Sequence, residues 1–267
     1  MFEIEASVLT HVGRVRTNNE DSVSLVRPCD QRHKSSHGTL AVVADGMGGH
    51  EGGEFASKLA LEAIVRGYYS SIAPPSAALE EAFQIANREV YAASQQNSAL
   101  KGMGTTCVAV AVRDDLAWWA WVGDSRLYLL RNRQIYRMTE DQTVVQELTR
   151  RGLLTPEEAH NHPDRSVLER ALGTRDHVEP ALGGQPIRLA TGDRLLLCSD
   201  GLHDLIGDAE ILECAAEGPV ADCADALLQG ALDRGGFDNV SILLLGASTR
   251  TATHRRTPVI TREYVVE

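Results

Sequence analysis

The first part of the chain contains short apolar stretches of the length that is typical of β-strands. We expect strands over residues 4–10, 22–27 and 39–44. The third stretch has little polarity and stops at Asp45, so it predicts a buried strand that carries an acidic residue to its rim. Five glycines fall within residues 46–53, and that much backbone freedom predicts a loop without regular structure.

Apolar residues then recur every three or four positions, first over residues 61–68 and again over 79–90. This period is typical of helices that bury one face, and Pro74 with Pro75 predicts a break between the two helices. Further apolar runs predict strands over 105–112, 116–122, 126–131, 187–190, 194–199 and 239–245, and helices over 144–151 and 220–233.

The order of these elements is strands, then helices, then strands, joined by short links. It predicts an α+β fold in which antiparallel β-sheets pack together and helices lie outside them. We expect residues 1–247 to form a single domain, with a polar, irregular insertion at about 141–176 that flanks a site. Residues 248–267 contain four arginines and five threonines, and we expect a flexible tail in which Tyr264 could begin an added strand.

The composition is that of an ordinary soluble globular protein, because 43% of the residues are hydrophobic and 24% are charged. No apolar run approaches the roughly 20 residues that a membrane-spanning helix needs. The formal charge of -11 disfavours nucleic acid and anionic membranes, which its field would repel. Five cysteines without a C-x-x-C pair are typical of reduced thiols, so we expect a cytoplasmic protein with no nucleic-acid or membrane partner.

Acidic residues cluster at five places, each at the end of an apolar strand and beside a glycine or a turn. The clusters are Arg16-Thr17-Asn18-Asn19-Glu20-Asp21, Asp45-Gly46-Met47-Gly48, Gly123-Asp124-Ser125-Arg126, Ser199-Asp200-Gly201 and Phe237-Asp238-Asn239. A single cluster of this kind is well explained as a turn. Five of them predict carboxylates that converge at one edge of a sheet, and oxygen ligands without histidine or cysteine favour Mg²⁺ or Mn²⁺ over Zn²⁺.

With these five clusters in this order, residues 5–246 resemble the metal-dependent protein phosphatases, also called the type 2C or PPM family, in their bacterial form. The resemblance implies two antiparallel β-sheets packed as a sandwich, with antiparallel helices on both outer faces. It also implies a serine/threonine phosphatase that hydrolyses phosphoserine and phosphothreonine in proteins. A water or hydroxide that bridges two Mn²⁺ or Mg²⁺ ions would attack the phosphate directly.

The resemblance assigns the two-metal core to five residues. Asp45 would bridge both cations. The carbonyl of Gly46 and the side chain of Glu20 would complete one site, and Asp200 and Asp238 would complete the other. Asp45 and Asp200 are therefore expected to be essential for catalysis.

Further roles follow from the same resemblance. Asp124 together with Asp200 would hold a third cation, and Asp21 and Asn239 would support the ligands from behind. Arg16 would bind the phosphate oxygens, because its planar fork matches two of them at once. The expected partners are phosphorylated proteins and a serine/threonine kinase with its substrates, and the chain is expected to act as a monomer.

Three residues near the site carry less specific signals. Many family members place a histidine, proposed as a proton donor, directly after the Asp-Gly pair, but this chain has Met47. His50 is close by in sequence, although a histidine in a glycine-rich loop is more often a surface residue. His162 resembles a residue at the substrate entrance of bacterial members, and a turn set by Pro163 explains it equally well.

Two other functions are alternative interpretations of this sequence. Cys107 and Arg113 match the C-x5-R spacing of cysteine-dependent phosphatases, but the alternating Val and Ala between them predict a strand whose N–H groups pair with neighbouring strands. The second alternative is a regulatory pseudophosphatase that only binds phosphoproteins, and the presence of every expected metal-binding acid weakens it.

Overall fold

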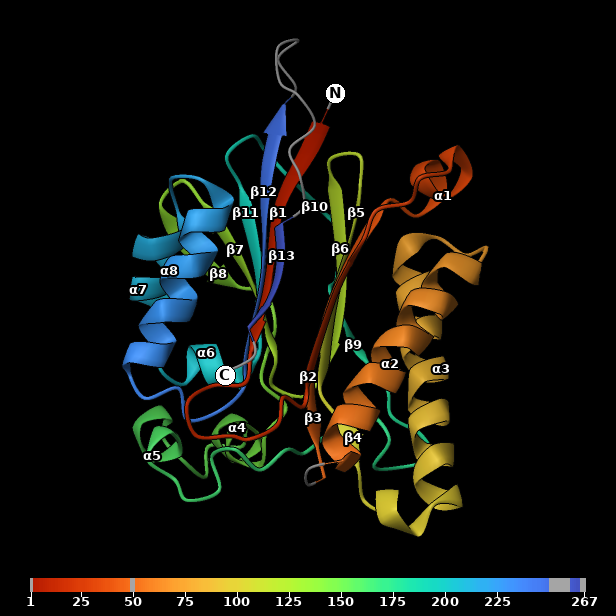
Figure 1. Ribbon diagram of the computed structural model, residues 1–267, viewed down its shortest axis with the longest axis vertical. Helices are drawn as coiled ribbons and strands as arrows, with labels where there is room; N and C mark the ends of the chain where they lie inside the picture. The colour runs from red at the N-terminus through yellow and green to blue at the C-terminus, as the bar shows by residue number, and fades with distance from the viewer. Residues whose placement is uncertain (1, 49–50, 250–259, 265–267) are drawn as a thin grey trace.

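The computed structural model describes residues 2–48, 51–249 and 260–264. Two β-sheets pack face to face, and helices cover the outer face of each sheet (Figure 1). The four layers confirm the predicted α+β sandwich. In the described part of the chain, no helix combines the length and the apolar character that crossing a membrane requires.

The first sheet is antiparallel throughout, with the order β10-β6-β5-β3-β2, while β4 adds to β3 and β9 adds to β6. Its strands are β2 (Asp21–Val26), β3 (Thr39–Met47), β4 (Gly104–Thr105), β5 (Cys107–Arg113), β6 (Leu116–Val122), β9 (Ala181–Leu182) and β10 (Ile187–Arg188). The central strands β3 and β5 are almost wholly buried, as their continuous apolar runs predict.

The second sheet has the order β13-β1-β12-β11-β7-β8, and every pair except the parallel β1 and β13 is antiparallel. Its strands are β1 (Phe2–His11), β7 (Arg126–Arg131), β8 (Gln134–Arg137), β11 (Arg194–Cys198), β12 (Val240–Thr249) and β13 (Ile260–Tyr264). Between the sheets lies an apolar layer that includes Val43, Leu197 and Leu243, all without exposed surface.

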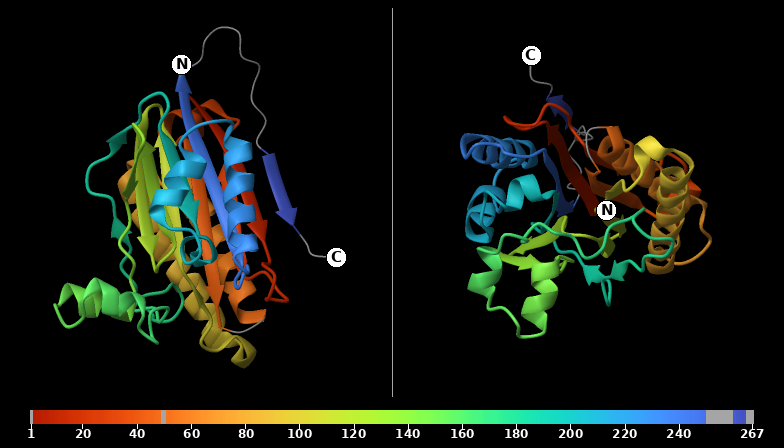
Figure 2. Two further views of the ribbon diagram at one scale, coloured as in Figure 1. Left: turned by 90° about the vertical axis from the view of Figure 1, so that its left-hand side faces the viewer. Right: turned by 90° about the horizontal axis from the view of Figure 1, so that it is seen from below.

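The helices fall into two groups and one insertion. Helices α2 (Glu51–Ser70) and α3 (Pro75–Gln96) pack on the first sheet, with α1 (Gln31–Ser36) nearby, while α6 (Asp200–His203), α7 (Asp208–Ala215) and α8 (Val220–Asp233) cover the second (Figure 1). Pro75 occupies the first turn of α3, where the missing N–H costs nothing. The short helices α4 (Val144–Arg150) and α5 (Pro156–His160) lie in the predicted insertion at 141–176, which Figure 2 shows projecting from one end of the sandwich.

The glycine-rich stretch 46–53 differs from the predicted loop. Gly46 continues strand β3, and helix α2 already begins at Glu51 and runs through Gly52 and Gly53. A Cβ atom added to Gly53 would lie 1.9 Å from Oε2 of Glu20, so this glycine allows two segments to approach closely. Packing therefore explains these glycines, and the prediction of an irregular loop is wrong here.

Two parts of the expected tail at 248–267 form β-strands. Ser248 and Thr249 extend β12 and pair with the beginning of β1, and Ile260–Tyr264 forms β13 along the other side of β1. An edge strand offers unpaired backbone groups, and β13 satisfies those of β1 over Ser7–His11. The rest of the predicted tail, 250–259 and 265–267, lies outside the described residues.

Candidate active site

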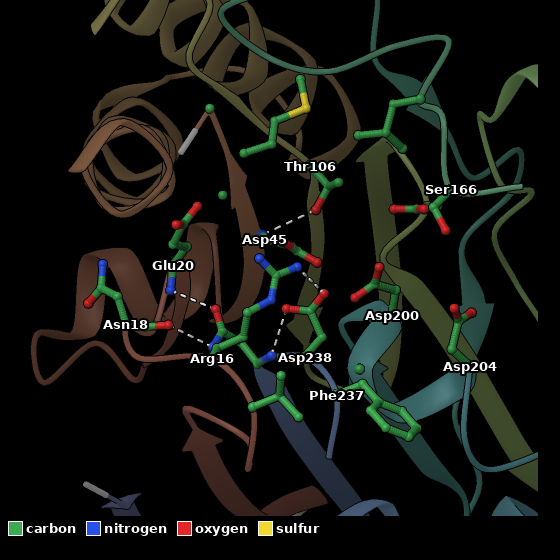
Figure 3. Close-up of a pocket in the computed structure, with 18 of the residues that line it drawn as sticks. Arg16, Asn18, Glu20, Asp45, Thr106, Ser166, Asp200, Asp204, Phe237 and Asp238 are labelled. Carbon is green, nitrogen blue, oxygen red and sulfur yellow. Dashed lines mark hydrogen bonds and ion pairs between the residues drawn. The ribbon is translucent and has the colours of Figure 1, made fainter. Parts of the chain in front are cut away.

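A cleft of about 1060 Å³ opens at the end of the sandwich where residues from both sheets come together. Its lining includes members of all five acidic clusters that the sequence singled out, although Asp21 itself lies behind the surface. Figure 3 shows the side chains of Asp45, Asp200 and Asp238 around the centre of the cleft. The sandwich thus brings together acids that lie up to about two hundred positions apart in sequence, because strand ends meet at one edge of a sheet.

Strand β3 fixes Asp45 through its backbone rather than through its side chain. The carbonyl oxygen of Asp45 accepts hydrogen bonds from Oγ1 of Thr105 and from the N–H of Thr106, both at 2.8 Å. The N–H of Asp45 donates to Oγ1 of Thr106 at 3.1 Å. With both backbone groups satisfied by residues beside β5, the carboxylate of Asp45 is left to face the cleft.

Asp21 stands directly opposite Asp45 in the pairing of β2 with β3. It is buried, and its Oδ2 accepts a hydrogen bond of 2.8 Å from Oγ of Ser199. Oγ of Ser199 in turn accepts from the N–H of Ser241 at 3.0 Å. Asp21 therefore connects β2 of the first sheet, through Ser199 at the end of β11, to β12 of the second sheet.

Asp200 and Asp124 reach the cleft from the second sheet and from the link between the sheets. Asp200 is the first residue of α6, directly after β11, and its Oδ1 is buried without a hydrogen-bond partner among the described residues. Asp124 lies in the turn between β6 and β7, and its carbonyl oxygen accepts a hydrogen bond of 3.1 Å from Nε2 of His203.

The neighbours of Asp124 are occupied elsewhere. Arg126 makes a bidentate pair with Asp141 at 2.7 and 3.0 Å, and Oγ of Ser125 shares a hydrogen bond with Oγ1 of Thr106 at 2.7 Å. The side chains of Ser125 and Arg126 therefore bind other residues, and the structure does not support the interpretation of Asp124 as an acid that only stabilises its own turn. The carboxylate of Asp124 faces the cleft.

Arg16 lies on the loop between β1 and β2, where its Nη2 donates to Oδ2 of Asp238 at 2.7 Å. The hydrogen bond to Asp238 raises the pKa of Arg16 and outweighs partial burial, so the guanidinium stays charged. The same loop brings Glu20 to the cleft (Figure 3). Gly46 reaches this loop too, because its N–H donates to the carbonyl oxygen of Glu20 at 3.1 Å.

Asn239 ties this loop to the start of β12. Its Oδ1 accepts from the N–H of Glu20 at 2.8 Å, and its Nδ2 donates to the carbonyl oxygens of Val12 and Asn18, each at 2.9 Å. The side chain of Asn239 is buried, whereas its three partner groups belong to partly exposed residues. These three contacts hold the loop that carries Glu20 against the start of β12.

The buried acids raise one another's pKa. Burial raises the pKa of Asp45 well above its ordinary value, and the charges of Asp21 and Asp200 raise it further. The pKa of Asp124 is also raised well above its ordinary value, first by burial and then by the charge of Asp200. Mainly because of burial, the pKa of Asp21 and that of Asp200 each rise to about 6. A nearby positive charge, such as a bound cation, would favour the ionised form of each of these carboxylates.

This donor set fits hard divalent cations. The available donors are carboxylate and carbonyl oxygens, which suit Mg²⁺ and Mn²⁺, and the unpartnered Oδ1 of Asp200 is one such donor. Among the described residues, no three carboxylate, imidazole or thiolate groups are close enough to enclose a cation by themselves. Mg²⁺ commonly keeps several waters and binds through one or two carboxylates together with substrate oxygens, so an open cleft of this kind suits it.

The insertion lines the cleft through Arg165 and the three residues that follow it, rather than through His162. Nδ1 of His162 accepts a hydrogen bond of 3.1 Å from the N–H of Asp164, so the imidazole stabilises a turn. Met47 lines the cleft, but its thioether has no proton to give. His50 lies outside the described residues.

The sequence did not single out Asp204 and Arg165. They form an ion pair of 3.7 Å on the cleft wall and come from α6's C-terminal cap and from the insertion. Asp204 lies four positions after Asp200, one helical turn away, and this spacing is the signal that could have identified it.

The alternative thiolate site is not formed. Cys107 and Arg113 occupy opposite ends of β5, roughly 20 Å apart at the usual rise per strand residue. Burial raises the pKa of the Cys107 thiol, which has no exposed surface. The Arg113 guanidinium lies over the ring of Trp118 instead, so the C-x5-R match is a coincidence, as the strand pattern predicted.

The sequence profile of the family described as "Protein phosphatase 2C" matches residues 14–229. Protein phosphatase PhpP of Streptococcus pneumoniae is 34% identical over 255 residues, covering 93% of this chain and 100% of PhpP. Serine/threonine protein phosphatase PstP of Mycobacterium tuberculosis is 41% identical over 235 residues, covering 87% of this chain and 43% of PstP. The crystal structure of the PstP catalytic domain in complex with 2 manganese ions has a TM-score of 0.80 and 36% identity, and the match covers 93% of this chain and 100% of that structure.

Proposed function

Because this chain belongs to the protein phosphatase 2C family, we propose that it is a metal-dependent phosphatase that removes phosphate from phosphoserine and phosphothreonine in proteins. The observation that carries the proposal is the convergence of acids from five separate segments, together with Arg16, on one cleft. The family relationship and the metal-suited donor set point to the same chemistry.

Arg16 orients the phosphate of the substrate. A guanidinium has five N–H donors, and the bond to Asp238 uses one of them. The remaining donors can bind two phosphate oxygens at once, because the fork matches their spacing. The bond to Asp238 also fixes the side chain, so less conformational entropy is lost when the phosphate binds.

The proposed cation ligands are the acids that line the cleft. These residues all line the cleft. Asp45 would contribute to both cation sites, the carbonyl of Gly46 and the side chain of Glu20 would serve one site, and Asp200 and Asp238 would serve the other. When bound, two divalent cations would supply an activated water and neutralise the charge on the phosphate.

Asp124 is our candidate for a third cation, together with Asp200. The support is that both residues line the same cleft, and that the charge of Asp200 raises the pKa of Asp124 in addition to burial.

The proposed partners follow from the chemistry. PhpP and PstP are both named as protein phosphatases, so phosphorylated proteins are the substrates we propose here, with a serine/threonine kinase as the opposing enzyme. All five cysteines are free thiols, which supports a reducing compartment such as the cytoplasm. We propose that the chain acts as a monomer.

The decisive experiment measures phosphate release from a phosphothreonine peptide with Mn²⁺, with chelator, and with Mn²⁺ restored. We expect turnover only when the metal is present. Asp45→Asn and Asp200→Asn should each lower kcat by a factor on the order of 10² or more, since each removes a ligand charge. Asp115→Asn, at a partly exposed acid that pairs with Arg188 outside the cleft, is the control and should leave kcat unchanged.

A second readout does not depend on turnover. Ligands that bind only the native state raise its stability, so Mn²⁺ should raise the melting temperature of the parent chain more than that of Asp45→Asn. Full activity in excess chelator would overturn the proposal. Tight binding of the phosphopeptide without release of phosphate would favour the pseudophosphatase instead.

A further inference from the structure

Apolar side chains are exposed around a cleft whose floor is charged. Phe237 is 61% exposed, Val15 is 61% exposed and Val167 is 47% exposed, and all three line the cleft. Among the described residues, these are three of the seven large apolar side chains with substantial exposure. Cation and phosphate chemistry needs none of them, so they call for a separate explanation.

Two hydrogen bonds pair the loops that carry Val15 and Phe237. The N–H of Arg14 donates to the carbonyl oxygen of Gly236 at 2.8 Å, and two residues further along, Nη2 of Arg16 donates to Oδ2 of Asp238 at 2.7 Å. Val15 and Phe237 are the residues between these two contacts on their respective loops. The apolar pair is therefore built into the same loop pairing that positions the phosphate-binding arginine.

The ring of Phe237 is exposed and yet held in place. Gly235 has a φ of 112°, and a Cβ atom added there would lie 2.5 Å from Cζ of the Phe237 ring. The ring therefore lies against the bare backbone of Gly235, a contact that other residues would block. Figure 3 shows the ring at the edge of the group of residues that line the cleft. An aromatic side chain held in this way binds a partner with little loss of conformational freedom.

The third apolar side chain comes from the insertion. The carbonyl oxygen of Val167 accepts a hydrogen bond of 2.9 Å from the N–H of Val144, and the neighbouring Leu168 pairs with Thr143. These backbone contacts anchor the segment that carries Val167. Hence the three side chains belong to two fixed parts of the cleft wall, namely the paired loops that carry Val15 and Phe237 and the insertion that carries Val167.

We propose that Val15, Val167 and Phe237 form a subsite that binds a bulky apolar side chain next to the phosphorylated residue of the substrate. The inference rests on the proposed phosphatase function and names its preferred substrates. Phe237 directly precedes Asp238, and all three apolar residues line the same cleft as Arg16 and Asp238, so a peptide whose phosphate is bound by Arg16 has these side chains within the same cleft. An apolar contact also adds affinity that does not depend on the repulsive acidic field.

The test compares short phosphothreonine peptides of equal charge. One has serine on both sides of the phosphothreonine, and two others have leucine on one side or the other. With Mn²⁺ present, the parent chain should have a kcat/KM about tenfold higher for at least one leucine peptide, as expected for partial burial of a leucine side chain. Because the peptides carry the same charge, the difference reports the apolar contact alone.

Phe237→Ala should reduce this leucine preference to near unity, while Phe237→Leu should keep most of it. Tyr136→Ala removes an aromatic side chain that is 44% exposed on β8 and away from the cleft, and it should keep the full preference. Melting temperatures check that each variant is folded.

The outcomes separate the two proposals. If no peptide is hydrolysed, the proposed function itself fails. If the parent chain hydrolyses all three peptides equally, or if Phe237→Ala keeps the leucine preference, the function stands and the apolar subsite is refuted.

Discussion

Replacing Asn239 by alanine tests whether one buried amide positions the loop that carries Arg16 and Glu20. The substitution removes three hydrogen bonds, to the N–H of Glu20 and to the carbonyl oxygens of Val12 and Asn18. A buried backbone group left without a partner costs about 1–3 kcal/mol, and some of these groups will recover a water. We therefore expect Asn239→Ala to lower the free energy of unfolding by about 3 kcal/mol.

The chain offers a matched control in Asn87. This amide is also buried and also makes three hydrogen bonds: Nδ2 donates to the carbonyl oxygens of Arg175 and Asp176, both at 3.1 Å, and Oδ1 accepts from the N–H of Gly173 at 2.9 Å. Asn87→Ala should therefore lose a similar amount of stability. Its contacts lie at the end of the insertion and not on the loop that carries Arg16.

Activity distinguishes the two variants. Misplacement of a positioning group by about 1 Å can cost a factor on the order of 10², so kcat/KM should fall by about that factor in Asn239→Ala and by about twofold at most in Asn87→Ala. Urea denaturation gives the stabilities, and phosphate release from a phosphothreonine peptide is measured where both variants are folded. Equal kcat/KM values for the two variants, or a stability loss below about 1 kcal/mol in Asn239→Ala, would refute the reasoning.

Three further predictions concern single side chains. Cys107→Ser should leave turnover intact while costing about 1–3 kcal/mol of stability, since it buries a hydroxyl among apolar residues; a folded but inactive variant would revive the thiolate mechanism. Asp124→Ala should lower kcat while Mn²⁺ still raises the melting temperature; an unchanged kcat across a manganese titration would remove Asp124 from the site. Burial would raise the pKa of Asp141, but the hydrogen bonds from Arg126 hold this pKa below its ordinary value. The ionised carboxylate therefore stabilises the fold above about pH 4, and this stabilisation is lost as the pH falls further. The stability gap between the parent chain and Asp141→Asn, measured with urea, should therefore shrink on acidification, and a gap that stays constant to pH 3 would contradict this.

The elements that follow strong periodicity could be predicted from the sequence. Helix α8 runs over Val220–Asp233, as its apolar stripe predicted, and the two sheets with outer helices match the expected architecture. The glycine-rich stretch could not be predicted, because its glycines serve contacts with Glu20 and Met103, and such contacts are invisible to local pattern. Glycine is used both where the backbone must be flexible and where two segments must pack closely, so the sequence alone does not distinguish the two cases.

The site was predictable to a similar degree. The acids lie at strand ends and are marked by adjacent glycines and turns, so their convergence followed from the pattern together with the family resemblance. The pairing of Asp204 with Arg165 and the exposed ring of Phe237 depend on how separate loops meet in space. Residue type alone did not indicate them, because an exposed apolar residue is common and becomes informative only beside a cleft.

The acids of the cleft, which lies where the two sheets meet, are needed for the proposed turnover but lower the stability of the fold. Like charges from both sheets face each other at one end of the sandwich, while the apolar layer around Val43 and Leu197 holds the sheets together. Asp45→Asn relieves this repulsion, so in chelator the variant should melt at a higher temperature than the parent chain although it is inactive. A population of variants selected only for thermal stability in the absence of metal should therefore lose these acids before it loses any part of the apolar layer.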